Sequence, residues 1–91
     1  MNDGTSIPGA KIEYALVSDT VGGTVFFGVA VSLTAHGETQ RAVLRELTSD
    51  RRLALDILNA MKRGGVTPCA AADVAQDMLA EDAVRRAESE R

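Results

Sequence analysis

Residues 24–34 read TVFFGVAVSLT and form the longest run of strand-favouring residues in the chain. Large apolar side chains occupy the odd positions of this run, whereas the even positions are small or polar apart from Phe26. A period of two residues is typical of a strand that buries one face. We therefore predict a central strand here, paired with the segments before and after it.

The preceding segment, residues 11–17, alternates in the same way and predicts a first strand. Gly22 and Gly23 suit the positive φ angles of a two-residue hairpin turn. A turn at this pair places Leu16 opposite Val29, so that the apolar faces of the two strands coincide. Because a slip of one residue would turn one apolar set to solvent, this agreement supports the register.

A second hairpin is predicted at His36 and Gly37, which can form another two-residue turn. The third strand is expected from about residue 39 to residue 46, with Ala42 opposite Val31. Polar side chains interrupt its inner face, which is typical of a strand at the edge of a sheet.

The second half of the chain predicts two helices, and the first has clear signals at both ends. Thr48 or Ser49 can cap its free amide groups, and Asp50 suits the positive end of the helix dipole. Gly64 and Gly65 follow two basic residues and provide the left-handed conformation that ends many helices.

The second predicted helix opens at Thr67 and Pro68, since threonine caps amide groups and proline fits a first turn. Its apolar stripe runs into charged residues after two to three turns. Residues 81–91 are expected to form a charged tail, helical or frayed, in which Glu81 pairs with Arg85 and Asp82 with Arg86.

The length of 91 residues and a hydrophobic content of 45% fit one domain with one core. The predicted class is α+β, with a three-stranded antiparallel meander sheet followed by two helices packed on one face. Residues 10–80 are expected to form this single β-β-β-α-α domain. Residues 1–9 are small and polar and are expected to be a disordered leader.

Several short motifs carry a resemblance to a known family. They are the tyrosine-bearing first strand, residues 27–29 (FGV), residues 66–68 (VTP) and residues 73–79 (DVAQDML). With these motifs, residues 12–80 resemble a small bacterial domain family of unknown function. The resemblance implies three strands followed by two helices, and it implies no chemistry.

Charge and cysteine content bear on compartment and partners. A formal net charge of −3 favours neither nucleic acid nor an anionic membrane. The single cysteine cannot form an intrachain disulfide, which suits a reducing compartment. The chain has neither a basic, apolar leader nor an apolar run long enough to span a membrane. We therefore expect a cytoplasmic protein.

Cys69 is one candidate for chemistry, because the start of a helix can lower the pKa of a thiol. A cysteine-dependent enzyme or redox sensor is thus a lesser alternative, and a dyad with His36 would require the two side chains to meet. The commoner interpretation is a small residue in an alanine-rich turn. Asp73, Asp77 and Glu81 form a helical row that is read as a solvated face. We predict no catalytic residue, metal or cofactor.

Four arginines near the third strand and first helix suggest a second alternative, a regulatory protein that associates with nucleic acid. They are Arg41, Arg45, Arg51 and Arg52. Basic side chains contact phosphates, but acidic residues are interleaved with these four and aromatic residues are few.

The sheet face opposite the two helices is the leading candidate site. Its predicted interface residues are Val17, Phe26, Ala30, Arg41 and Val43. An apolar patch with an aromatic side chain is typical of a protein interface. The leading hypothesis is a non-enzymatic protein–protein interaction module, homodimeric through this face or through an edge strand.

Overall fold

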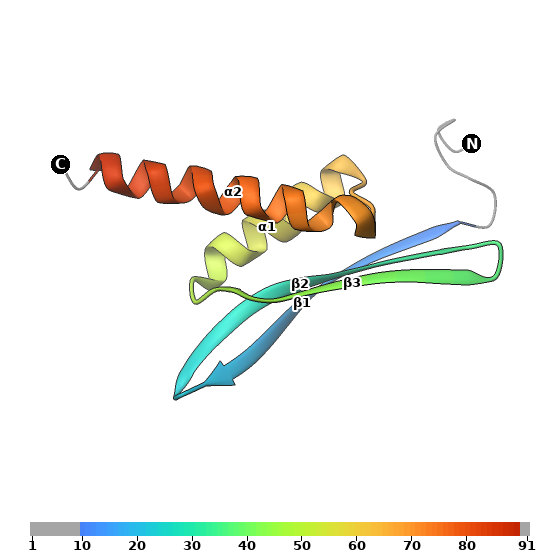
Figure 1. Ribbon diagram of the computed structural model, residues 1–91, viewed down its shortest axis with the longest axis horizontal. Coiled ribbons are helices and arrows are strands. Elements are labelled where there is room, and N and C mark those ends of the chain that lie inside the picture. Colours follow the sequence, from blue (N-terminus) through green and yellow to red (C-terminus); the bar gives the residue numbers. More distant parts are fainter. Residues whose placement is uncertain (1–9, 90–91) are drawn as a thin grey trace.

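A computed structural model describes residues 10–89 and shows three strands followed by two helices (Figure 1). The predicted leader, residues 1–9, lies outside the described residues. The elements are β1 (Lys11–Val21), β2 (Thr24–Ala35), β3 (Glu38–Thr48), α1 (Arg51–Gly64) and α2 (Pro68–Ser89). The predicted α+β class and the order of elements are confirmed.

The sheet is antiparallel with the strand order β1-β2-β3. Leu16 lies opposite Val29, and Val31 lies opposite Ala42, so the predicted register of both hairpins is confirmed. Gly22 and Gly23 have φ angles of 57° and 83° and form the predicted two-residue turn. β1 extends to the turn itself, four residues beyond the predicted strand of 11–17, because the ladder continues without a break up to Val21.

β3 departs from the prediction by containing a bulge. Val29 lies opposite Leu44, but Phe27 lies opposite Thr48, so residues 45–47 face Gly28 alone. Glu46 takes a left-handed φ of 56° at this bulge. The strand therefore runs to Thr48 rather than ending at residue 46, and the extra residues bring Leu47 onto the core.

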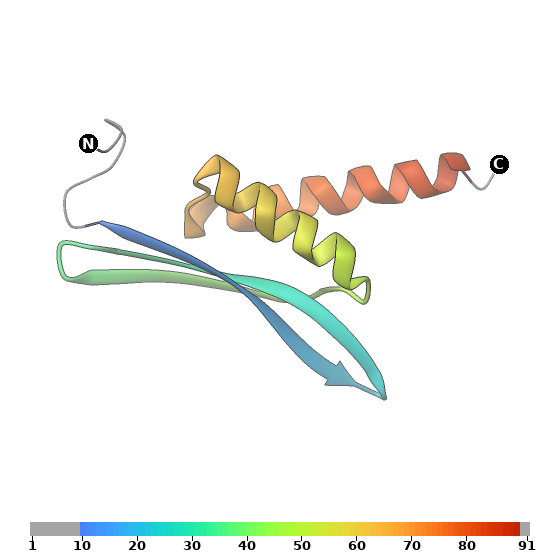
Figure 2. The ribbon, with the colours of Figure 1, turned by 180° about the vertical axis from the view of Figure 1, so that it is seen from behind.

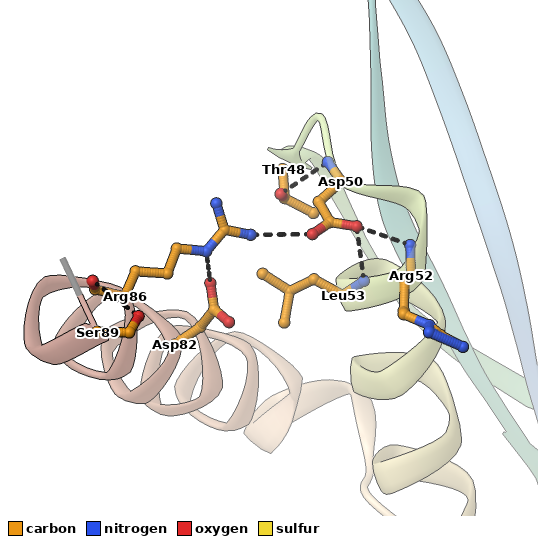
Figure 3. Close-up of polar contacts among 7 residues, drawn as sticks. All are labelled: Thr48, Asp50, Arg52, Leu53, Asp82, Arg86 and Ser89. Carbon is orange, nitrogen blue, oxygen red and sulfur yellow. Dashed lines mark hydrogen bonds and ion pairs between the residues drawn. The ribbon is translucent and has the colours of Figure 1, made fainter.

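α1 is capped by Asp50, not by Thr48 or Ser49 as predicted. The Asp50 carboxylate accepts hydrogen bonds from the backbone N–H groups of Arg52 and Leu53, at 3.0 and 3.3 Å (Figure 3). The Thr48 hydroxyl accepts instead from the Asp50 N–H, at 3.0 Å. Asp50 is the residue whose extended backbone aims its side chain at the first turn.

The last turns of α2 are tied to the start of α1. Arg86 Nη2 donates to Asp50 Oδ2 at 2.9 Å, and Arg86 Nε lies 2.7 Å from Asp82 Oδ2 (Figure 3). The predicted Asp82–Arg86 pair thus forms, and its arginine also reaches α1, whereas the predicted Glu81–Arg85 pair is not among the ion pairs of residues 10–89. Helical structure in the predicted tail continues to Ser89.

Both helices pack on the same face of the sheet (Figures 1 and 2). Val29 and Val31 of β2 are fully buried there against Ile57 and Met61 of α1, and Ala71 of α2 completes the contact. Small residues in α2 allow its backbone to approach the sheet closely. The core therefore lies between one sheet face and the helix layer.

A side-chain hydrogen bond joins the first strand to the connection between the helices. The Tyr14 hydroxyl donates to the Val66 carbonyl oxygen at 2.9 Å. Gly65, with φ of 61°, ends α1 in the left-handed conformation, and the Val66 N–H bonds back to the Met61 carbonyl at 3.1 Å. The turn between the helices is thus held against the core face of β1.

Candidate interaction surface

The second face of the sheet carries neither helix, and we call it the open face. Among the described residues it is formed by alternate positions of all three strands. Its members are Lys11, Glu13, Ala15, Val17 and Asp19 of β1, Phe26, Gly28, Ala30 and Ser32 of β2, and Arg41, Val43 and Arg45 of β3.

The predicted interface residues all belong to the open face, but their exposure differs. Val43 is 37% exposed and Arg41 is also exposed, whereas Val17 and Phe26 are partly buried. Ala30 is only 7% exposed, although neither α1 nor α2 covers it. Its small side chain lies on the central strand and is screened by its neighbours on both sides.

A shallow hollow of about 220 Å³ lies beside Ala30 on this face. Ala15, Ala30 and Ser32 line it with small side chains, while Glu13 and Arg41 stand on opposite sides of it. Glu13 and Arg41 both lie opposite Ser32, one on each outer strand. The hollow is therefore lined by two alanines and a serine and carries one charge of each sign at its margin.

Ion pairs cross the rest of the open face. Arg45 Nη1 lies 3.1 Å from Asp19 Oδ1, and this ion pair spans the sheet from β3 to β1. Lys11 Nζ lies 3.2 Å from Glu13 Oε2 along β1. Asp19 was not among the predicted site residues, because the sequence placed it in a turn rather than in a strand. Its alternation with Val17 is the signal that identifies its face.

The four arginines of the nucleic-acid alternative do not gather on one surface. Arg41 and Arg45 lie on the open face, whereas Arg51 and Arg52 occupy the first turn of α1, on the other side of the sheet. Arg45 is also paired with Asp19. The structure thus divides this basic cluster into two pairs.

Cys69 and His36 occupy separate elements. Cys69 is exposed in the first turn of α2, and His36 is exposed in the turn between β2 and β3. Within residues 10–89, no hydrogen bond joins the two, and no group of three or more acidic, histidine or cysteine side chains is placed to hold a metal ion. No helix in this part of the chain is long and apolar enough to cross a membrane.

Comparison with known proteins identifies a family. A search of the curated proteins found no match, and a search of the solved structures likewise found none. One family model matches residues 5–81, which include all three strands, α1 and the core-packed part of α2. This chain has the three-strand, two-helix order that the motifs implied, and it belongs to the family of unknown function DUF6514.

Proposed function

We propose that this protein is a non-enzymatic protein–protein interaction module whose open face binds a protein surface. The observation that supports the proposal is the one-sided packing of the sheet, in which both helices cover one face (Figures 1 and 2). The other face keeps an apolar centre of Val17, Phe26, Ala30 and Val43 without a described helix above it. An apolar centre with polar margins is the usual anatomy of a protein interface.

The charges on the open face favour a protein partner over nucleic acid. Arg45 is paired with Asp19 and Lys11 with Glu13, so that acidic and basic groups alternate over the surface. Phosphate backbones instead select surfaces with a clear excess of positive charge. A partner side chain placed in the hollow beside Ala30 would meet one charge of each sign, at Glu13 and Arg41.

The proposed module works in the cytoplasm. The single cysteine supports this placement, because it is exposed at Cys69 and suits a reducing compartment.

Site-specific photocrosslinking in native cells tests the proposal. A photoreactive amino acid in place of Val43, which is exposed on the open face, should give a discrete covalent adduct with another polypeptide. The same probe in place of Arg63, which is exposed on α1, should not give it. Adding Phe26→Ala to the Val43 probe should remove the adduct, because aromatic side chains near the centre of an interface carry much of the binding energy.

The Phe26→Ala variant must remain folded for this result to count, and circular dichroism checks that. Phe26 is only partly buried, so its removal should cost less than the approximately 3–5 kcal/mol of a core phenylalanine. Identical adducts from the Val43 and Arg63 positions, or none from Val43, would contradict the proposed function.

A further inference from the structure

The two edges of the sheet differ in how well they can accept another strand. β3 is interrupted by the bulge at residues 45–47, where Glu46 is left-handed. β1 pairs with β2 over all of its 11 residues without a bulge. Bulges protect exposed edges from pairing with other strands, and β1 lacks such protection. The outer edge of β1 is therefore the available one.

The geometry of the first turn shows which backbone groups lie along that edge. Val21 and Thr24 close the two-residue turn as a hydrogen-bonded pair, so the odd-numbered residues of β1 direct their N–H and C=O groups toward β2. The even-numbered residues direct theirs away from the sheet. The outward-facing residues are Ile12, Tyr14, Leu16, Ser18 and Thr20, and no described strand pairs with them there.

We propose that a second copy of this chain pairs with the β1 edge, antiparallel, about a two-fold axis through Ala15. In this register Ala15 faces its own copy, Tyr14 faces Leu16 and Lys11 faces Asp19 of the other chain. The outward-facing groups of the two edges then form about eight backbone hydrogen bonds. The two three-stranded sheets become one continuous sheet with all helices on the same side.

Charge complementarity selects this register over its neighbours. Lys11 and Asp19 both lie on the open face, where each has an ion-pair partner of its own chain, Glu13 and Arg45. The two-fold axis brings Lys11 of each copy beside Asp19 of the other and so adds two contacts between opposite charges. Moving the axis by one residue to Leu16 would set Glu13 against Asp19 in both copies, which is repulsive. Moving it to Tyr14 would remove the Lys11–Asp19 contact and shorten the paired segment.

This dimer uses the edge of the sheet and leaves the open face free, so it does not depend on the proposed function. It does have a consequence for that face. Two open faces would join edge to edge, with Ala15 and Val17 of both chains at the seam. A protein that binds the open face would then meet a continuous surface twice as large as that of one monomer.

Engineered cysteines test the register directly in a Cys69→Ser background, since Cys69 is the only cysteine and is exposed. Ala15→Cys is expected to form a disulfide-linked dimer on mild oxidation. Residues on the two-fold axis form a non-hydrogen-bonded pair with a Cα–Cα distance of about 4.5 Å, which a disulfide can span. Crosslinking should be about tenfold faster than for Arg63→Cys, an exposed helix position that serves as the collision control.

The flanking positions provide a second arm that separates this register from others. Glu13 of one copy faces Val17 of the other, so an equal mixture of Glu13→Cys and Val17→Cys chains should crosslink. Each variant alone should crosslink only as slowly as the Arg63→Cys control. Crosslinking of Ala15→Cys at the collision rate, or failure of the mixed pair, would overturn the proposed register.

A proline substitution tests edge pairing without cysteines. Ser18→Pro removes an outward N–H that β2 does not use, so the monomer should keep its fold, as circular dichroism would show. Because the dimer loses this donor in both copies, its dissociation constant in sedimentation equilibrium should rise about tenfold or more. A wild-type chain that stays monomeric at all accessible concentrations would refute the dimer. An adduct at Val43 would still support the proposed function in that case.

Discussion

The two faces of β2 reach low exposure by different means. Val29 and Val31 are fully buried because large side chains of α1 pack on them. Ala30, on the opposite face, is 7% exposed although it has only neighbouring strands beside it. Low exposure on one face thus reflects tertiary packing, and on the other it reflects a small side chain on a central strand. Substitutions on the two faces should therefore differ in cost and in mechanism.

Val31→Asp should have the largest effect and should unfold the domain. It places a carboxylate among apolar side chains with no partner, which costs several kcal/mol against a total stability of about 5–10 kcal/mol. Ser32→Asp is the matched control, since it adds the same charge to the adjacent open-face position beside Arg41. If thermal melts showed Ser32→Asp to be the more damaging change, the assignment of the buried face and the open face would be reversed.

Gly28→Ala should have the next largest effect, although it lies on the open face. An added Cβ would overlap the Leu44 carbonyl oxygen and lie 2.9 Å from the carbonyl carbon, because the β3 bulge crosses closely here. We expect a loss of about 3 kcal/mol in urea denaturation, since rigid backbone cannot yield as a side chain can. Ala30→Gly, at the next open-face position along β2, should cost less. Equal stability of Gly28→Ala and wild type would mean that the bulge is absent.

Tyr14→Phe should have the smallest effect, about 1 kcal/mol at neutral pH, through loss of its bond to the Val66 carbonyl. Burial raises the pKa of Tyr14, because its surroundings disfavour the charged phenolate. The resulting stabilisation is complete below the unfolded-state pKa of about 10 and is lost as pH rises through the folded-state pKa. The chain has one tyrosine, so ultraviolet absorbance follows this titration alone.

Comparison of wild type and Tyr14→Phe across this range isolates the contribution of the phenol. The variant should lack the part of the alkaline destabilisation that arises from Tyr14. Parallel stability curves for the two proteins above pH 10 would show that the phenol is equally solvated in both states.

The regular part of the sheet was predictable because its signals are local. Two-residue turns at Gly22 and Gly23, and at His36 and Gly37, fix the pairing once apolar residues alternate on both sides. The bulge was missed because it depends on contact between two strands. Gly28 within a strand interior was the available signal, since such a glycine often marks a close approach of backbone.

The candidate surface was predictable in membership but not in detail. Alternation assigned Val17, Phe26 and Val43 to one face, whereas the low exposure of Ala30 depends on residues from both outer strands. The Asp50–Arg86 pair could not be predicted from the sequence either, because its residues are 36 positions apart and meet only through the packing of two helices.

The chain path around the Tyr14–Val66 bond has a consequence for folding kinetics. Both strand pairs join neighbours in sequence through two-residue turns, so each hairpin closes a short loop at small entropic cost. The tyrosine bond instead joins residues 52 positions apart and requires both the sheet and the connection between the helices. Because short loops close at the lowest entropic cost, we expect the hairpins to form early and the helix layer to dock onto β1 late. The single tyrosine is therefore expected to report the docking of the helices rather than the first collapse of the chain.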